Sequence, residues 1–121
     1  MNIAIYYTHC ESLGHTTRVL NITNYIKKKY GDGVNIMVLQ GGREQPYIKH
    51  CGETINLPKP NYGRHYFYIG KNKKKNGPDI VKERVDMMKK ALEKFNPDVF
   101  ITELFPLGRD DCVMEIMPIL K

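Results

Sequence analysis

The segment YYTHCESLGHTTRVLNITNYI, residues 6–26, contains the pattern that decides the fold. It begins in the apolar run Ile3 to Tyr7, which is typical of a strand buried on both faces. A glycine, a histidine and two threonines follow, and the sequence then predicts a helix that begins near Gly14 or His15 and stops at Gly31 or Gly33. The helix prediction rests on apolar residues at helical spacing, namely Val19, Ile22 and Ile26.

The same alternation of strand and helix repeats along the rest of the chain. Buried strands are predicted over 34–42 and from Val99 to Glu103 or Leu104, and a weaker strand is predicted over 53–58. Helices are predicted over 79–95, where one stripe is apolar and the opposite face is charged, and over 109–121. The segment REQPYIKHC suits a short helical turn, and residues 58–78 read as a long connection rich in Pro, Gly, Tyr and Lys.

This order of elements indicates a single α/β domain over residues 1–121. Buried strands that alternate with amphipathic helices predict a Rossmann-like, mostly parallel sheet of about four strands flanked by helices. In such sheets ligands bind beyond the carboxyl ends of the strands, where the strand order reverses. We therefore expect the functional residues in the loops that follow the strands.

Composition limits the classes of protein to which the chain can belong. It has 121 residues, 41% of them apolar and 26% charged, which is ordinary for a globular domain. No run approaches the ~20 apolar residues of a membrane-spanning helix, and no signal peptide is visible. The three cysteines are widely separated and have no metal-ligand spacing, so we expect free thiols and a cytoplasmic location: Cys10, Cys51 and Cys112.

The net charge of +6 raises the expectation of an anionic partner. Four lysines gather in the segment KNKKKNG, where two interpretations remain open: a solvated loop, or a patch that contacts an anionic membrane surface. Aromatic residues do not interleave with these lysines, so we do not expect a nucleic-acid groove. The residues concerned are Lys71, Lys73, Lys74 and Lys75.

The first strand-end loop leads into a helix N-terminus, where free backbone N–H groups attract anions. Gly14 permits close approach of a ligand, Thr16 and Thr17 offer hydroxyl groups, and Arg18 offers a charge. His15 can donate to a phosphate or accept a proton from a hydroxyl group. The alternative is that Ser12 or Thr16 only caps the helix and that His15 is exposed. The loop matches neither the P-loop nor the G-x-G-x-x-G pattern.

Two further loops are expected at the same edge of the sheet. In the second, Gly41 and Gly42 precede Arg43, and the glycines either form a turn or leave room for a ligand. The third loop runs from Glu103 to Asp111; its polar residues either form helix caps and a local ion pair or face a ligand. Its candidate binding residues are Gly108, Arg109 and Asp110.

Four segments in order resemble one family. YYTHCESLGHTTRVLNI, LQGGREQPYI, LPKPNYGRH and NPDVFITELFPLGRDDC together resemble the N-terminal half of predicted glycosyltransferases with the GT-B fold. These enzymes are distant relatives of the transferase that adds N-acetylglucosamine to the lipid intermediate of peptidoglycan. The resemblance extends from Asn2 to about Pro118.

The resemblance implies an acceptor-side domain that works with a separate donor-binding domain. The donor is a nucleotide sugar, the acceptor has a hydroxyl group, and neither a metal nor a cofactor is required. By the same resemblance His15 is an acceptor contact or base. Glu103 is the other candidate base, because it lies at the end of a predicted strand beside the third loop. A complete GT-B enzyme is roughly two to three times as long, so we expect an incomplete GT-B unit without its donor domain, inactive alone, either truncated or one subunit of a split enzyme.

Two alternatives from other classes remain open. A flavodoxin-like electron-transfer domain would bind the phosphate of FMN through Thr8, Ser12, Thr16 and Thr17. A non-catalytic interaction domain would use the fourth strand as an uncovered edge, together with the apolar last helix, to pair with another chain or with itself.

Overall fold

The computed structural model describes residues 1–8, 13–59, 77–103 and 112–121. Four strands and three α-helices alternate along the chain, with a short 3₁₀ turn after the first helix. In order, these elements are β1 (Asn2–Thr8), α1 (Gly14–Tyr30), η1 (Gly31–Gly33), β2 (Asn35–Gly41), β3 (Glu53–Asn56), α2 (Gly77–Phe95), β4 (Val99–Thr102) and α3 (Val113–Leu120).

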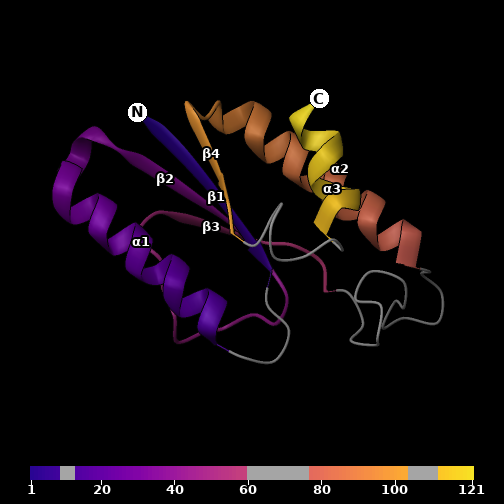
Figure 1. Cartoon of the computed structure of the whole chain (residues 1–121), viewed down its shortest axis with the longest axis horizontal. Helices are drawn as coiled ribbons and strands as arrows, with labels where there is room; N and C mark the ends of the chain where they lie inside the picture. Colours follow the sequence, from indigo (N-terminus) through magenta and orange to yellow (C-terminus); the bar gives the residue numbers. More distant parts are fainter. Residues whose placement is uncertain (9–12, 60–76, 104–111) are drawn as a thin grey trace.

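The strands form one parallel sheet in the order β3-β2-β1-β4. Helix α1 covers one face of the sheet, and α2 and α3 lie on the other (Figure 1). This arrangement confirms the predicted α/β class and is consistent with a Rossmann-like fold. It follows from the sequence because β1 and β2 are almost continuous apolar runs, which suit strands with both faces covered.

The strand order reverses between β1 and β4. From β1 the chain passes through α1 to β2 and then to β3 on one side, whereas α2 carries it back across the sheet to β4 on the other side of β1. The carboxyl ends of β1 and β4 therefore flank the switch point, which is where open parallel sheets usually bind ligands.

Two apolar cores hold the helices to the sheet, because alternate residues of each strand point to opposite faces. On one face Ile5 and Val38 pack with Val19 of α1. On the other, Tyr6 and Leu39 pack with residues of α2 and α3 that include Met88 and Ile116.

Some ends of the elements match the predicted ones and others differ. Gly31 ends α1, as one of the two predicted stops, with a φ of +57° and an N–H group that donates to the Lys27 carbonyl. Helix α3 begins only at Val113, and the predicted acidic start at 110–111 lies outside the described residues. Of the helical turn predicted over 43–51, the structure contains one turn of four residues, in which the Ile48 N–H donates to the Gln45 carbonyl and Pro46 occupies the second position, as is common in β-turns.

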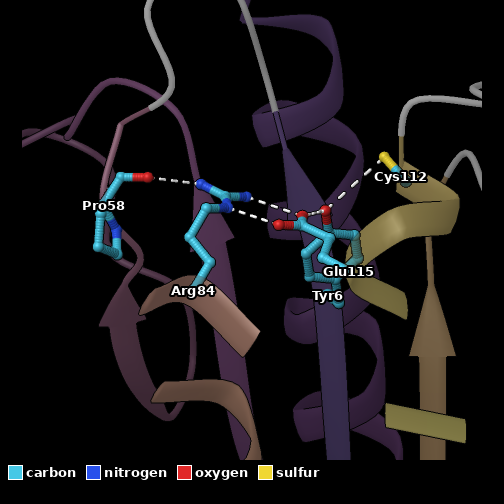
Figure 2. A network of polar contacts seen from close by, with 5 residues as sticks. All are labelled: Tyr6, Pro58, Arg84, Cys112 and Glu115. Carbon is cyan, nitrogen blue, oxygen red and sulfur yellow. Dashed lines mark hydrogen bonds and ion pairs between the residues drawn. The ribbon is translucent and has the colours of Figure 1, made fainter. Parts of the chain in front are cut away.

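A buried ion pair joins α2 to α3 (Figure 2). Both Arg84 and Glu115 are fully buried, and two guanidinium nitrogens, Nε and Nη2, lie 2.6 and 2.9 Å from the two carboxylate oxygens. The third nitrogen, Nη1, donates to the Pro58 carbonyl at 2.7 Å. The pair is bidentate and ties the chain after β3 to both helices, which offsets the cost of burying two charges.

The same network reaches β1 through Tyr6. Its hydroxyl donates to Glu115 and lies 3.7 Å from the Cys112 sulfur. Burial raises the pKa of Tyr6 well above its ordinary value, and the negative charge of Glu115 raises it further. Burial alone would lower the pKa of Arg84, but Glu115 reverses this effect and the pKa rises. The phenol therefore stays protonated and the guanidinium charged.

Candidate functional site

The first turn of α1 brings His15 to the end of β4. Glu103 directly follows β4, and its N–H group donates to the Tyr6 carbonyl at 2.9 Å, which continues the pairing of β4 with β1 by one residue. The Nδ1 atom of His15 lies 3.0 Å from each carboxylate oxygen of Glu103. The two side chains that the sequence nominated as candidate bases are thus in direct contact, at the switch point of the sheet.

Arg18 joins this pair from the next turn of α1. Its guanidinium forms an ion pair and a hydrogen bond with the Glu103 carboxylate. The Glu103 side chain is only 7% exposed, whereas those of His15 and Arg18 are 20% and 60% exposed. A nearly buried carboxylate is therefore compensated by a guanidinium and an imidazole, as a buried charge requires.

This geometry gives His15 a defined chemical capacity. When Nδ1–H donates to Glu103, the other ring nitrogen, Nε2, is left as a proton acceptor. The adjacent carboxylate also stabilises the positive charge that forms when the ring takes up a proton. A carboxylate-oriented imidazole at a strand end is an arrangement that serves a general base.

The remaining candidates of the first loop take different positions. Gly14 begins α1, and Thr17 is exposed on its first turn. Thr16 is fully buried and its hydroxyl group lies against the Tyr7 phenol. It does not cap the helix, because the N-cap residue is Leu13, which makes no side-chain capping bond. Ser12 lies outside the described residues.

The second loop lies at the end of β2, which β1 separates from β4. Gly41 packs against the buried network: a Cβ atom there would lie 2.4 Å from Arg84 Nη2 and 2.7 Å from Thr8 Oγ1. Gly42 has a φ of +105°, so it forms the turn. The Arg43 carbonyl accepts a hydrogen bond from Gln40. The space at Gly41 is thus occupied by the protein itself.

The candidates of the third loop lie outside the described residues, as do the four lysines of KNKKKNG. These residues are Gly108, Arg109, Asp110, Lys71, Lys73, Lys74 and Lys75.

The structure also shows a buried polar pair that the sequence did not reveal. The Tyr7 hydroxyl lies 3.0 Å from Nε2 of His50, and the two rings meet edge to face. Burial raises the pKa of Tyr7, partly offset by the Thr16 hydroxyl, and burial lowers the pKa of His50. Both side chains are thus neutral near pH 7. No local pattern marks His50, because its partner lies 43 positions away.

Within the described ranges, no cluster of three or more His, Cys, Asp or Glu side chains suits a metal ion. Neither Cys51 nor Cys112 forms a disulfide with another residue in the described ranges. None of the helices in the described part of the chain is both long and apolar enough to cross a bilayer.

Comparison with known proteins gives no match: no family model, no curated protein and no solved structure is similar to this chain.

Proposed function

We propose that this chain is the acceptor-side domain of a GT-B glycosyltransferase, in which His15 activates the acceptor hydroxyl group. The observation that carries the proposal is the contact between His15 and Glu103 at the switch point between β1 and β4. It supports a base that a carboxylate orients, at the edge of a parallel sheet where such folds bind their ligands.

The chemistry that this proposal assigns is a displacement at the anomeric carbon of a nucleotide sugar. Nε2 of His15 takes the proton of the acceptor hydroxyl, and the acceptor oxygen forms a bond to the anomeric carbon as the bond to the nucleoside diphosphate breaks. Glu103 holds the imidazole in position and stabilises its positive charge. Arg18 balances the carboxylate. The leaving diphosphate requires cationic groups or helix N-termini, which the donor-binding domain supplies in this scheme.

The scheme predicts that transfer needs a donor-binding domain opposite this one. The test is to assay the chain alone and together with a donor-binding domain, whether fused or supplied as a second chain, and to measure nucleoside diphosphate released from a panel of nucleotide sugars. We expect release that depends on both domains and on an acceptor. Equal transfer by the chain alone would contradict the proposed division of labour.

The flavodoxin-like alternative has less support from the geometry. Thr16, one of its four phosphate ligands, is fully buried against Tyr7, and a buried hydroxyl cannot reach a phosphate at the surface. Absorbance near the flavin bands after incubation with FMN tests this alternative directly.

A second candidate function, pairing with another chain, has one observation in its favour. Within the described residues β4 is an edge strand, and it contains no charged side chain to discourage pairing. Helix α3 also exposes apolar side chains, namely Val113, Met114, Met117 and Leu120. Light scattering over a range of concentrations tests this function; a monomer at every concentration would argue against self-association.

A further inference from the structure

A cavity of about 310 Å³ lies between the 42–52 connection and the carboxyl ends of β2 and β3. Its volume falls at the lower end of the ~300–1,000 Å³ typical of small-molecule sites. Most of the side chains that line it are polar, and those that carry the argument are Gln40, Glu44, Lys49, His50, Thr54 and Asn56.

The sheet supplies one wall of this cavity through polar residues of β2 and β3, and Tyr7 of β1 continues their row beyond the cavity lining. Tyr7, Gln40 and Asn56 are register partners on three neighbouring strands, so their side chains lie in one line on the same face. Helix α1 packs on the same face of the sheet, closer to the middle of the strands. Tyr7 and Gln40 are polar residues at the ends of the two buried strands β1 and β2, and Asn56 extends the row on the largely exposed β3.

The loop that forms the opposite wall is held in one position. Gly52 has a φ of +121°, and a Cβ atom there would lie 2.2 Å from the Ile36 carbonyl oxygen, so only glycine permits the loop to pack against β2. At its other end Gly42 forms a turn with a φ of +105°. A ligand would therefore meet a wall that is largely formed before it binds, which lowers the entropic cost of binding.

His50 contributes an unsatisfied polar atom to this cavity. Its side chain lines the cavity and the residue is only 7% exposed. Nε2 bonds to Tyr7, whereas Nδ1 has no hydrogen-bond partner among the described residues. A buried polar atom without a partner costs about 1–3 kcal/mol. Whichever ring nitrogen carries the proton, Nδ1 has one hydrogen bond still to make.

The chemistry of the lining selects the class of ligand. The amide nitrogen of Gln40 donates to the Arg43 carbonyl at 3.2 Å and that of Asn56 donates to Glu44 at 3.3 Å, so each amide offers a ligand its oxygen and its second N–H. The charges of Glu44 and Lys49 are opposite. A hydroxyl group also donates and accepts, so it satisfies Nδ1 of His50 in either tautomer. An anion such as phosphate would gain no excess of positive charge here.

We propose that this cavity binds a neutral, polyhydroxylated small molecule of monosaccharide size, with hydrogen bonds to Gln40, His50 and Asn56. This binding does not depend on the transferase proposal, because none of these residues belongs to the His15 site. If both proposals hold, the cavity holds a sugar unit of the acceptor, and that identification alone rests on the proposed function.

The test is an NMR titration of the ¹⁵N-labelled chain with glucose and N-acetylglucosamine as probes and inorganic phosphate as the anionic comparison, with binding detected from shifts of the protein's own resonances. We expect both sugars to bind, phosphate not to bind, and the ring ¹⁵N resonances of His50 to shift on addition of sugar. Asn56→Leu should weaken sugar binding roughly fivefold or more, the loss of one or two hydrogen bonds. Asn21→Leu makes the same change on the exposed surface of α1 and should leave binding unchanged.

Several outcomes would overturn the proposal. They are the absence of resonance shifts with either sugar, binding of phosphate in preference to sugar, equal weakening by Asn56→Leu and Asn21→Leu, or binding that leaves the His50 resonances in place. Unfolding curves of both variants establish that they are folded. Because the readout is binding rather than turnover, failure here and failure of the transferase proposal are distinguishable.

Discussion

Nδ1 of His15 lies 3.0 Å from both carboxylate oxygens of Glu103, although 88 positions separate the two residues. The contact exists because α2 returns the chain across the sheet and places β4 beside β1, where α1 begins. Either residue alone would be an ordinary polar side chain at a strand end. Together they form an imidazole that is oriented through Nδ1, and the proposed transferase chemistry depends on that pairing.

Replacing Glu103 with Gln should lower kcat in the transferase assembled with its donor domain. The change removes the charge that stabilises the imidazolium but leaves the size of the side chain unchanged. We expect kcat to fall about 10²-fold or more, with little change in KM. The measurement is steady-state kinetics, with Glu93→Gln on the exposed side of α2 as the control. A variant with unaltered kcat would show that Glu103 is only a structural partner of Arg18.

Breaking the buried ion pair should destabilise the fold. In Arg84→Met the Glu115 carboxylate keeps its charge without its bidentate partner, and we expect a loss of about 3–5 kcal/mol in the free energy of unfolding. The double variant Arg84→Met with Glu115→Leu should recover part of this loss, because no charge is then left unpaired. Urea unfolding measures both.

The control for this prediction is the exposed pair Lys27–Asp32, where Lys27→Ala should change stability little. If Arg84→Met and Lys27→Ala had similar midpoints, the buried pair would have no special role.

Gly41 should not tolerate even a methyl group. A Cβ atom would lie 2.4 Å from Arg84 Nη2 and less than 3 Å from Thr8, so Gly41→Ala forces a shift in a tightly packed network. We expect a loss of about 1–3 kcal/mol in the free energy of unfolding. Gly33→Ala is the matched control, since a Cβ there has no atom within 4 Å. Equal urea midpoints for the two variants would contradict this packing.

His50 should make the stability of the protein depend on pH. Burial lowers the pKa of His50 in the folded state. Below about pH 6.5, the ordinary pKa of histidine, the unfolded chain therefore binds a proton at this residue more readily than the folded chain does. Stability should therefore fall as the pH drops from about 7.5 through 6.5 and stop falling below the lowered pKa. Urea unfolding at a series of pH values measures this.

The variant His50→Gln should lose the part of this dependence that belongs to His50. At pH 8 the histidine is neutral in both states, so the difference between the variant and the parent there reports only the lost contacts. A pH dependence that is identical in the two proteins would show that burial does not affect the protonation of His50.

The local pattern of the sequence was enough to predict the strands, the helices and the α/β class. Apolar runs mark β1 and β2, and the glycine that ends α1 was among the two predicted stops. The 43–51 segment contains a single turn at 45–48 rather than a longer helical one, and its composition suits either, so local pattern does not fix its extent.

Long-range contacts account for what the sequence did not reveal. Arg84 lies on the apolar side of α2, four positions from both Ile80 and Met88, and that spacing is the one signal that could have marked it as buried. His50 carries no such signal. The sequence indicates His15 and Glu103 as alternative candidate bases. Only the strand order shows that the two side chains meet.

Turnover of the variant His15→Ala, in the enzyme assembled with its donor domain, tests the central claim most directly. Asn21→Ala is the control, because Asn21 is exposed on α1 and belongs to neither proposed binding site. We expect His15→Ala to lower kcat by about 10²–10⁴-fold and Asn21→Ala to leave it nearly unchanged. Unaltered kcat in His15→Ala would contradict the assignment of His15 as the base.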